Sequence, residues 1–254
     1  MYHLSNAFHR LRLRVLVVGC GGTGGFAAEG LCRVLPADAD LVLIDHDRVE
    51  ERNLGRQNFF SPDLGGVKSE VLAERLARRY RRAVAYSTYP VAMANLNGAD
   101  VIVGCVDNGP ARRDIAEMVK ERRPVVWWVD AGNGENYGQI LIGNLEMGYF
   151  DAKREVCDGL PLPTMQRPEL LSQVSQPLSC ADAPEQGPTI NRVMADLVVE
   201  VVRRIIEGTC PWMQLLLDMQ LGSLYPVMAT PEAVAKIIGK KRVKIAPDSE
   251  RRKT

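Results

Sequence analysis

Short runs of consecutive apolar residues recur along the first 140 residues of the chain, separated by stretches of helical composition. The clearest runs lie at residues 14–18 (RVLVV), 41–45 (LVLID), 100–106 (DVIVGCV) and 124–130 (PVVWWVD). Uninterrupted apolar runs of this length are typical of parallel strands that are covered on both faces. Two further strands are predicted at 84–89 and 138–142, and helices at 26–35, 67–82 and 110–120. This alternation predicts an α/β fold with a Rossmann-like, doubly wound, mostly parallel sheet.

The pattern changes after residue 143. Residues 143–187 are rich in Pro, Ser and Gln and show little periodicity, so an irregular crossover segment of functional importance is predicted there. Residues 188–206 form a long apolar helix that ends before Gly208. Two strands at 212–220 and 224–230 are predicted to form an antiparallel hairpin at one sheet edge, followed by a short helix at 231–239. We expect residues 1–239 to form a single domain.

Charge is distributed unevenly, although the formal net charge of the 254 residues is only +1. Residues 240–254 hold seven basic and two acidic side chains, a net charge of +5, so the rest of the chain carries −4. A mildly acidic body does not favour nucleic-acid binding, and the basic end is expected to be a disordered tail.

Composition narrows the setting further. No apolar stretch is long enough to span a bilayer, and residues 1–14 lack the apolar core of a secretory signal. The six cysteines include no C-x-x-C pair, so neither a disulfide framework nor a zinc site is expected. A cytoplasmic protein without a membrane partner is the resulting expectation.

A glycine-rich loop follows the first predicted strand, and Gly19, Gly21 and Gly24 fit the pattern G-x-G-x-x-G. Glycines let the backbone approach a phosphate, and the N-terminus of the next helix adds free N–H groups. Asp45 ends the second strand, where it can accept hydrogen bonds from ribose hydroxyls. These features predict a nucleotide site but leave NAD, FAD and ATP open.

Cationic residues on the following loops favour a triphosphate. Arg56 and Lys68 both follow the second strand, on the segment that leads into the next predicted helix. Their charges would neutralise a polyphosphate and stabilise a leaving pyrophosphate. Asp107 follows a buried strand, so we expect it at the carboxyl edge of the sheet, where a carboxylate suits Mg²⁺.

Five segments in this order carry a family resemblance: GCGGTGG, LVLIDHDRVE, NLGRQ, DLGGVK and CVDNGPAR. Over about residues 14–143 the chain resembles the ThiF/MoeB adenylyltransferases, bacterial relatives of the ubiquitin-activating enzymes. The resemblance implies a homodimer that binds ATP with Mg²⁺ and adenylates the C-terminal carboxylate of a small ubiquitin-like (β-grasp) protein. Chain length and the 217–231 region look most like the ThiF-like subgroup of the plasmid-associated PRTRC systems.

Individual roles follow from the same resemblance. It implies that Gly22 contacts the nucleotide and Asp45 the ribose. The phosphates would be bound by Asn53, Arg56 and Lys68. Asp107 would be the Mg²⁺ ligand, with Asn108 beside it.

Some roles near this motif stay open. Asp107 is also suited to cap the helix that follows it. Arg112 is expected either to pair with Asp107 or to face solvent. Family members often carry an arginine ahead of the first strand that reaches the partner subunit's ATP, and here Arg10 or Arg12 would have to take that role.

Transfer of the acyl group to a cysteine occurs in some relatives. Cys180 precedes the 188–206 helix, a placement that resembles the PRTRC subgroup, and it is the first candidate nucleophile. Cys157, beside Lys153 and Arg154, is the second. An incidental thiol is the alternative for both. Cys20, Cys32 and Cys105 are expected to act as small apolar side chains.

Two other functions share parts of this pattern. An NAD-dependent oxidoreductase would use the same glycine loop and Asp45, but the three histidines all precede Asp47 and offer no proton-transfer group further along. A non-catalytic dimeric scaffold for a ubiquitin-like partner would have no use for Arg56, Lys68 and Asp107 together.

Overall fold

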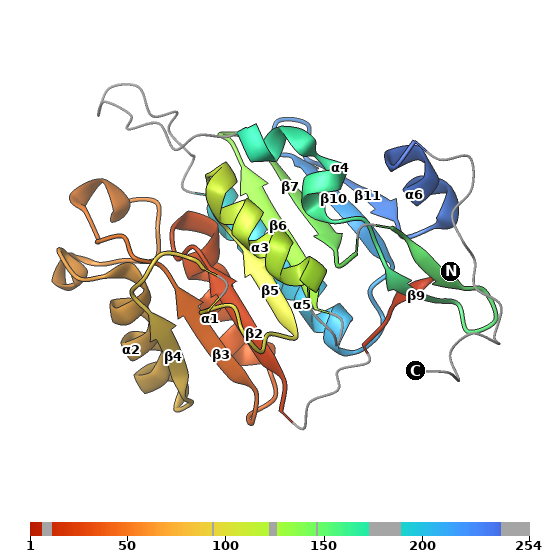
Figure 1. Cartoon of the computed structure of the whole chain (residues 1–254). Helices are drawn as coiled ribbons and strands as arrows, with labels where there is room; N and C mark the ends of the chain where they lie inside the picture. The colour runs from red at the N-terminus through yellow and green to blue at the C-terminus, as the bar shows by residue number, and fades with distance from the viewer. Residues whose placement is uncertain (7–11, 93, 122–125, 146, 173–188, 240–254) are drawn as a thin grey trace.

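An eight-stranded mixed sheet forms the centre of the protein (Figure 1). The computed structural model describes residues 1–6, 12–92, 94–121, 126–145, 147–172 and 189–239. The strand order across the sheet is β11-β10-β7-β6-β5-β2-β3-β4. Its strands are β2 (Arg14–Val18), β3 (Asp40–Ile44), β4 (Val84–Ser87), β5 (Val101–Gly104), β6 (Trp127–Asn133), β7 (Tyr137–Gly143), β10 (Trp212–Asp218) and β11 (Ser223–Met228).

The parallel half comprises β6, β5, β2, β3 and β4, as the apolar runs predict. The predicted doubly wound sheet is confirmed, and β2 has the predicted bounds. Helices connect and cover the strands: α1 (Gly22–Val34), α2 (Lys68–Tyr80), α3 (Gly109–Glu121) and α5 (Ile190–Ile206). The chain winds from β2 through β3 to β4 on one side and from β5 to β6 on the other, so the direction reverses between β2 and β5.

Successive residues of β2 point into two different cores. Val15 and Val17 are buried with residues of α1, α2 and α5, whereas Leu16 and Val18 are buried with residues of α3. Figure 1 shows α5 behind the sheet and α3 in front of it. Each fully buried aliphatic side chain contributes roughly 1.5–3 kcal/mol, so a strand with no polar face is stabilised from both sides.

The antiparallel half begins at β7, which pairs with β6 on one side and β10 on the other. The predicted C-terminal hairpin is confirmed: β10 and β11 pair antiparallel, and β11 is the outer strand of the sheet. Pro226 lies within β11, opposite Leu215 of β10. After the hairpin, α6 (Pro231–Ile237) begins with a Thr230 hydroxyl that accepts a hydrogen bond from the Ala233 N–H.

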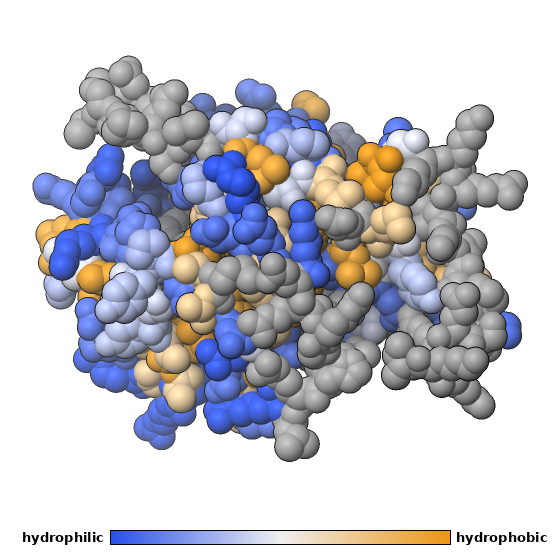
Figure 2. Space-filling model, viewed as in Figure 1, coloured by the Kyte–Doolittle hydropathy of each residue, from blue (hydrophilic) through white to orange (hydrophobic). Residues whose placement is uncertain are grey.

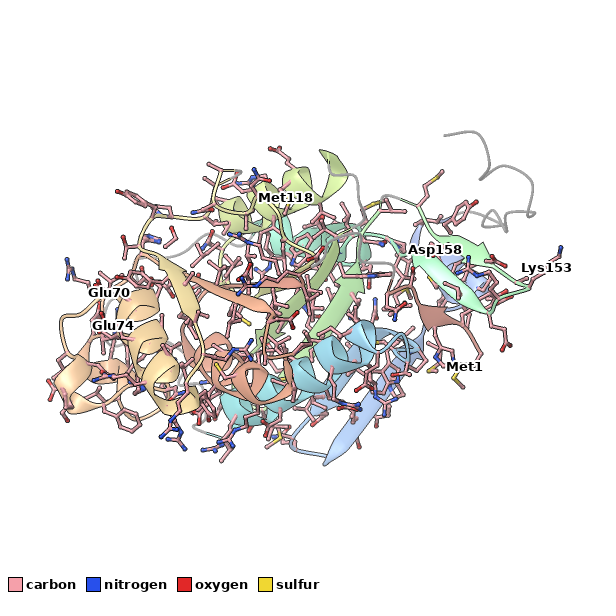
Figure 3. All side chains as sticks on the ribbon, turned by 90° about the horizontal axis from the view of Figure 1, so that it is seen from below. Met1, Glu70, Glu74, Met118, Lys153 and Asp158 are labelled. Atoms are coloured by element: carbon pink, nitrogen blue, oxygen red, sulfur yellow. The ribbon has the colours of Figure 1, made fainter. Side chains whose placement is uncertain are left out.

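The prediction of an irregular segment is wrong for residues 143–172. Here β8 (Tyr149–Asp151) and β9 (Val156–Gly159) pair with each other, and β9 also pairs with β1 (His3–Leu4) at the N-terminus. Short helical elements follow: α4 (Pro163–Gln166) and η3 (Pro168–Ser172). Figure 3 shows Met1, Lys153 and Asp158 of this small sheet region at the end of the molecule opposite Glu70 and Glu74 of α2.

The surface in the view of Figure 2 is mostly polar over α2 and β4. No helix in the described part of the chain combines the length and the apolar character needed to cross a membrane. The predicted basic tail, residues 240–254, lies outside the described residues, as does the second part of the predicted crossover segment.

Candidate nucleotide-binding site

A cavity of about 480 Å³ opens at the carboxyl ends of β2, β3, β5 and β6. This is the place where the winding of the sheet reverses, and ligands of open α/β sheets bind at such points. Residues from the predicted set that line the cavity are Gly19, Gly21, Gly22, Asp45, Arg56, Lys68, Asp107 and Asn108. The sheet therefore brings together residues that are up to 89 positions apart in the sequence.

The glycine loop packs closely against neighbouring backbone, which is possible because Gly19 and Gly24 carry no side chain. A Cβ atom at Gly19 would lie 2.5 Å from the Cys105 carbonyl oxygen, and Gly19 has a φ of +87°. A Cβ at Gly24 would lie 1.8 Å from the Gly19 carbonyl oxygen. Gly24 does not line the cavity, so its contribution is to let the first turn of α1 pack against the Gly19 carbonyl group. Since α1 begins at Gly22, the free N–H groups of its first turn face the cavity end of the sheet.

Asp45 is buried directly after β3 and holds two loops together. Its Oδ2 accepts a hydrogen bond from the Cys20 N–H at 2.6 Å, and its Oδ1 accepts one from the Asp47 N–H at 2.9 Å. Burial raises the pKa of this carboxyl, while the Lys68 ammonium and the two N–H donors oppose the rise. The carboxylate thus fixes the glycine loop as well as lining the cavity.

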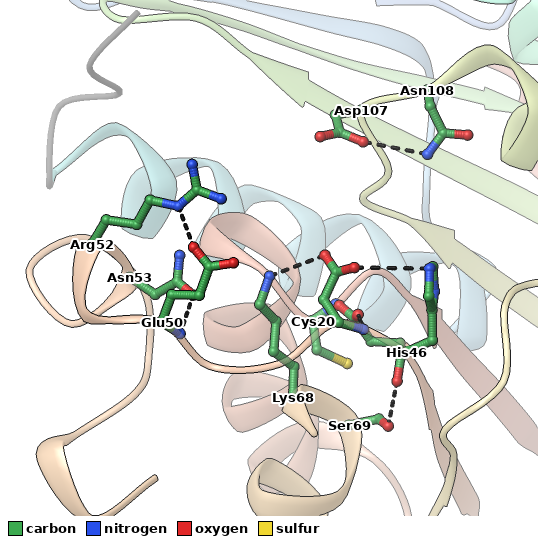
Figure 4. A network of polar contacts seen from close by, with 11 residues as sticks. Cys20, His46, Glu50, Arg52, Asn53, Lys68, Ser69, Asp107 and Asn108 are labelled. Atoms are coloured by element: carbon green, nitrogen blue, oxygen red, sulfur yellow. Dashed lines mark hydrogen bonds and ion pairs between the residues drawn. The ribbon is translucent and has the colours of Figure 1, made fainter. Parts of the chain in front are cut away.

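Lys68 reaches the cavity from the first residue of α2. Its Nζ lies 3.2 Å from Asp47 Oδ2 (Figure 4). The neighbouring Ser69 hydroxyl donates to the Asp45 and Ser87 carbonyl oxygens at 2.7 and 3.0 Å, which ties the helix start to the ends of β3 and β4. The lysine is therefore held in place, with its ammonium group directed to a partner that a phosphate could replace.

Arg56 and Asn53 belong to one loop but have different surroundings. Arg56 lines the cavity, and its N–H donates to the Asn53 carbonyl at 3.2 Å. The Asn53 side chain is buried and accepts a hydrogen bond from the Glu50 N–H at 2.9 Å. Asn53 does not line the cavity, so in this structure it shapes the loop that carries Arg56.

Asp107 lies across the cavity from Lys68, on the loop after β5 (Figure 4). The expectation that it caps α3 is wrong, because the Asn108 side-chain oxygen accepts the hydrogen bond from the Ala111 N–H at 2.9 Å. The Asn108 amide also donates to Asp107 Oδ1 at 3.3 Å. Asn108 therefore begins the helix and orients Asp107, whose carboxylate faces the cavity.

Arg112 takes neither of its two expected positions. Its Nε lies 3.2 Å from both carboxylate oxygens of Asp130 in β6, and the two side chains are only 2% and 0% exposed. Burial raises the pKa of Asp130, and the guanidinium opposes that rise. Arg112 forms part of the cavity wall, and the buried Asp130 holds its guanidinium group.

Carboxylates at two places could bind a hard cation: one place combines Asp45 and Asp47 with His46, and the other is the single carboxylate of Asp107. Asp45, His46 and Asp47 bring potential ligand atoms within 4.8 Å of one another, but the Lys68 ammonium already lies against Asp47. Asp107 has a neutral amide as its neighbour and faces the cavity. Carboxylate oxygen is the donor that Mg²⁺ prefers, so the predicted position at Asp107 fits that ion.

Polar residues with no role predicted from the sequence also line the cavity, among them Gln57, Asn133 and Asn191. The Gln57 Oε1 is buried and has no hydrogen-bond partner among the described residues, which is unusual for a polar atom. Asn191 lies on the apolar face of α5. A polar residue that interrupts an apolar helix face is the feature of the sequence that could have identified it.

The described cysteines are poor nucleophiles. Cys157 lies buried in β9 and its thiol donates to the Gly159 carbonyl oxygen at 3.3 Å. Burial raises the pKa of Cys157 well above its usual value, so its proposal as second candidate is not supported. Burial also raises the pKa of Cys105, to about 12. Cys180 lies outside the described residues.

The two candidate arginines ahead of the first strand have different outcomes. Arg12 lies two residues before β2, at the amino ends of the parallel strands, whereas the cavity lies at their carboxyl ends. There it donates to the Asp38 carbonyl and lies 3.0 Å from the Asp40 carboxylate. Arg10 lies outside the described residues.

Relatives among curated proteins match about half of the chain. The adenylyltransferase and sulfurtransferase MOCS3 of Mus musculus is 38% identical over 119 residues, which is 44% of this chain and 25% of that protein. Ubiquitin-like modifier-activating enzyme 5 of Branchiostoma floridae is 30% identical over 148 residues, 51% of this chain and 35% of that protein. The matches therefore span no more than about a third of these relatives.

Solved structures show the same fold over more of the chain. PaaA superposes with a TM-score of 0.64 at 18% identity, over 86% of this chain and 73% of that one. E. coli MccB, solved with ATP, gives a TM-score of 0.64 at 18% identity over 85% of this chain and 64% of that one. The model of the ThiF family matches residues 8–207, and this protein belongs to that family.

Proposed function

We propose that the protein is an ATP-dependent adenylyltransferase that activates the C-terminal carboxylate of a small ubiquitin-like protein. The observation that carries the proposal is the arrangement of Asp45, Arg56, Lys68 and Asp107 around one cavity at the switch point of the sheet. Names of relatives support it: one is an adenylyltransferase, another activates a ubiquitin-like modifier, and the MccB fold has been solved with ATP.

In this proposal the nucleotide spans the cavity from β3 to β5. Asp45 accepts hydrogen bonds from the ribose, and Gly19, Gly21 and Gly22 bring the backbone close to the phosphates. Arg56 and Lys68 neutralise the triphosphate. Asp107, oriented by Asn108, would hold Mg²⁺, which when bound adds positive charge at the phosphates.

The reaction itself needs positioning and charge more than acid–base groups. A substrate carboxylate oxygen attacks the α-phosphorus, and the bond from that phosphorus to the bridging oxygen breaks. Pyrophosphate leaves with the bonding electrons, and the acyl adenylate remains. Arg56 and Lys68 stabilise the charge that develops on the leaving group. The protein needs no proton transfer at this step. Among the described residues that line the cavity, His46 is the one histidine.

Carboxylate-dependent exchange between ATP and labelled pyrophosphate tests this function. Arg56→Ala and Asp107→Ala are each expected to reduce exchange by at least about 10²-fold, the size of effect seen when one transition-state charge contact is removed. Both variants should unfold at the same denaturant concentration as the parent. Exchange at the parental rate in both variants would contradict the mechanism, and dinucleotide binding without a response to Mg²⁺ would favour an oxidoreductase instead.

Two further parts of the proposal concern partners and transfer. We propose a homodimer, by analogy with the family resemblance. Transfer of the acyl group from AMP to Cys180 stays a prediction of the sequence, with the thiolate attacking the acyl carbon and AMP leaving.

A further inference from the structure

Asn191 is a buried polar residue that the proposed mechanism does not use. It lies in the first turn of α5 with no exposed surface, on the same helix face as Met194, Ala195 and Val198. A carboxamide on an apolar face costs free energy unless both its N–H₂ and its oxygen find partners. The partners of Asn191 therefore indicate why a polar residue occupies this position.

Both ends of the carboxamide are bonded, and both bonds lead to the cavity. Its Nδ2 donates to the Arg56 carbonyl oxygen at 3.1 Å, and its Oδ1 accepts from Asn133 Nδ2 at 3.0 Å. Asn133 in turn accepts from the Thr23 hydroxyl at 2.9 Å. This chain of hydrogen bonds, the Asn191 network, joins the start of α5, the end of β6, the start of α1 and the loop of Arg56.

Gly22 shows how closely the network packs against the glycine loop. A Cβ atom at Gly22 would lie 2.4 Å from Asn191 Nδ2 and 2.5 Å from its Cγ. The carboxamide therefore occupies the space that a side chain at residue 22 would need. Gly22 is required at this position for the contact with α5, in addition to any contact with a nucleotide.

We propose that Asn191 is a positioning residue, which fixes the main chain of Arg56 and the glycine loop in the geometry that binds a triphosphate. The inference rests on the proposed function. Arg56 stands on a loop, and a cationic side chain contributes most when its backbone is already held in the binding geometry. Asn191 supplies that support from a helix 135 residues further along the chain.

Asn191→Leu tests the proposal, because leucine has a similar shape to asparagine but can make neither hydrogen bond. Titration calorimetry with ATP and with adenosine separates the effects. We expect the Kd for ATP to rise at least about tenfold, the effect of losing roughly 1.4 kcal/mol of binding free energy. The Kd for adenosine should change by less than about twofold, since adenosine has no phosphate for Arg56 to bind. In exchange assays the KM for ATP should rise more than kcat falls.

Asn144→Leu is the matched control. Asn144 is equally buried, donates to the Asp158 carbonyl at 2.9 Å and accepts from the Leu160 N–H at 2.9 Å, and it does not line the cavity. We expect it to lower the free energy of unfolding like Asn191→Leu but to leave ATP binding unchanged. Equal weakening of ATP binding in both variants, or parental ATP binding by Asn191→Leu, would overturn the inference. A parent protein that binds no ATP would instead overturn the proposed function.

Gly22→Ala gives a second test that does not depend on how well Asn191→Leu folds. The added methyl group should displace the carboxamide and weaken ATP binding. Asn191→Ala restores the space, so the loss of ATP binding in the double variant is expected to be smaller than the sum of the two single losses. Additive losses in the double variant would show that the two residues act independently and would overturn the coupling.

Discussion

Two ion pairs with the same separation lie at the cavity, and they differ in how far the carboxylate of each pair is exposed to solvent. On the β3 side, Lys68 Nζ lies 3.2 Å from Asp47; the lysine side chain is only 10% exposed, and the Asp47 side chain is 58% exposed. On the β6 side, Arg112 Nε lies 3.2 Å from Asp130, which is fully buried. In the proposed function a phosphate would replace the exposed carboxylate of the open pair, Lys68 with Asp47, whereas the closed pair cannot release either partner without leaving a buried charge. Burial of the carboxylate, and not its distance from the cation, distinguishes the two pairs.

In a third cluster of charged residues, every side chain is partly exposed to solvent. Glu200 on α5 lies 2.8 Å from Arg203 and 2.6 Å from Arg204, and these side chains are each about a third exposed. The hydrogen bond from Arg203, followed by that from Arg204, lowers the pKa of Glu200 to about 2 against the cost of burial. Water screens such pairs, so their contribution to stability is small.

The closed pair should show the largest effect on stability. Arg112→Leu leaves the Asp130 carboxylate buried without its cation, so we expect the free energy of unfolding to fall by about 3–5 kcal/mol. Denaturant titration measures the loss. The double variant Arg112→Leu, Asp130→Leu removes both charges and should recover a large part of it. A single variant that loses less than about 1 kcal/mol would show that the pair is not closed to water.

The open pair should affect chemistry far more than stability. Lys68→Met is expected to reduce pyrophosphate exchange by about 10²–10³-fold, because one cation at the leaving group is lost. Its free energy of unfolding should fall by less than that of Arg112→Leu, because the partner Asp47 is exposed, although the buried Asp45 also loses a nearby cation. Lys236→Met, at an exposed position on α6, is the control and should leave exchange unchanged. A large loss of stability with intact exchange would reverse the comparison.

The exposed cluster should show the smallest effect, visible through pH. Because the pKa of Glu200 is lowered from 4.5 to about 2, its stabilisation is present above pH 4.5 and is lost as the pH falls toward 2. Glu200→Gln should therefore lower the melting temperature slightly at pH 7 and not at pH 2. The difference corresponds to less than about 1 kcal/mol and should shrink in 1 M salt. An equal difference at both pH values would exclude the ion pair as its cause.

Much of the parallel half could be predicted from the sequence. Strands buried on both faces leave uninterrupted apolar runs such as residues 14–18, and the loops that follow them must meet at one edge. For that reason the sequence alone predicts that Asp45, Lys68 and Asp107 lie near one another. The structure places all three around one cavity.

Other parts carried too weak a signal. The small sheet joins His3 and Leu4 to residues 156 and 157, and strands of two to four residues are too short to show a periodicity. The pairing of Arg112 with Asp130 depends on β6 lying beside β5, so it follows from the sheet order and not from the local pattern. Asn191 was detectable only as a polar break in an apolar helix face.

Pro226 in the outer strand β11 has a consequence for association. Among the described residues β11 is the outer strand of the sheet. An outer strand offers N–H and C=O groups to any other strand, and a proline within it has no N–H to offer. Another sheet is therefore hindered from pairing edge to edge with β11, which limits aggregation at this edge. If two copies assemble, they would do so more readily through packed side chains on other surfaces than by extending the sheet at β11.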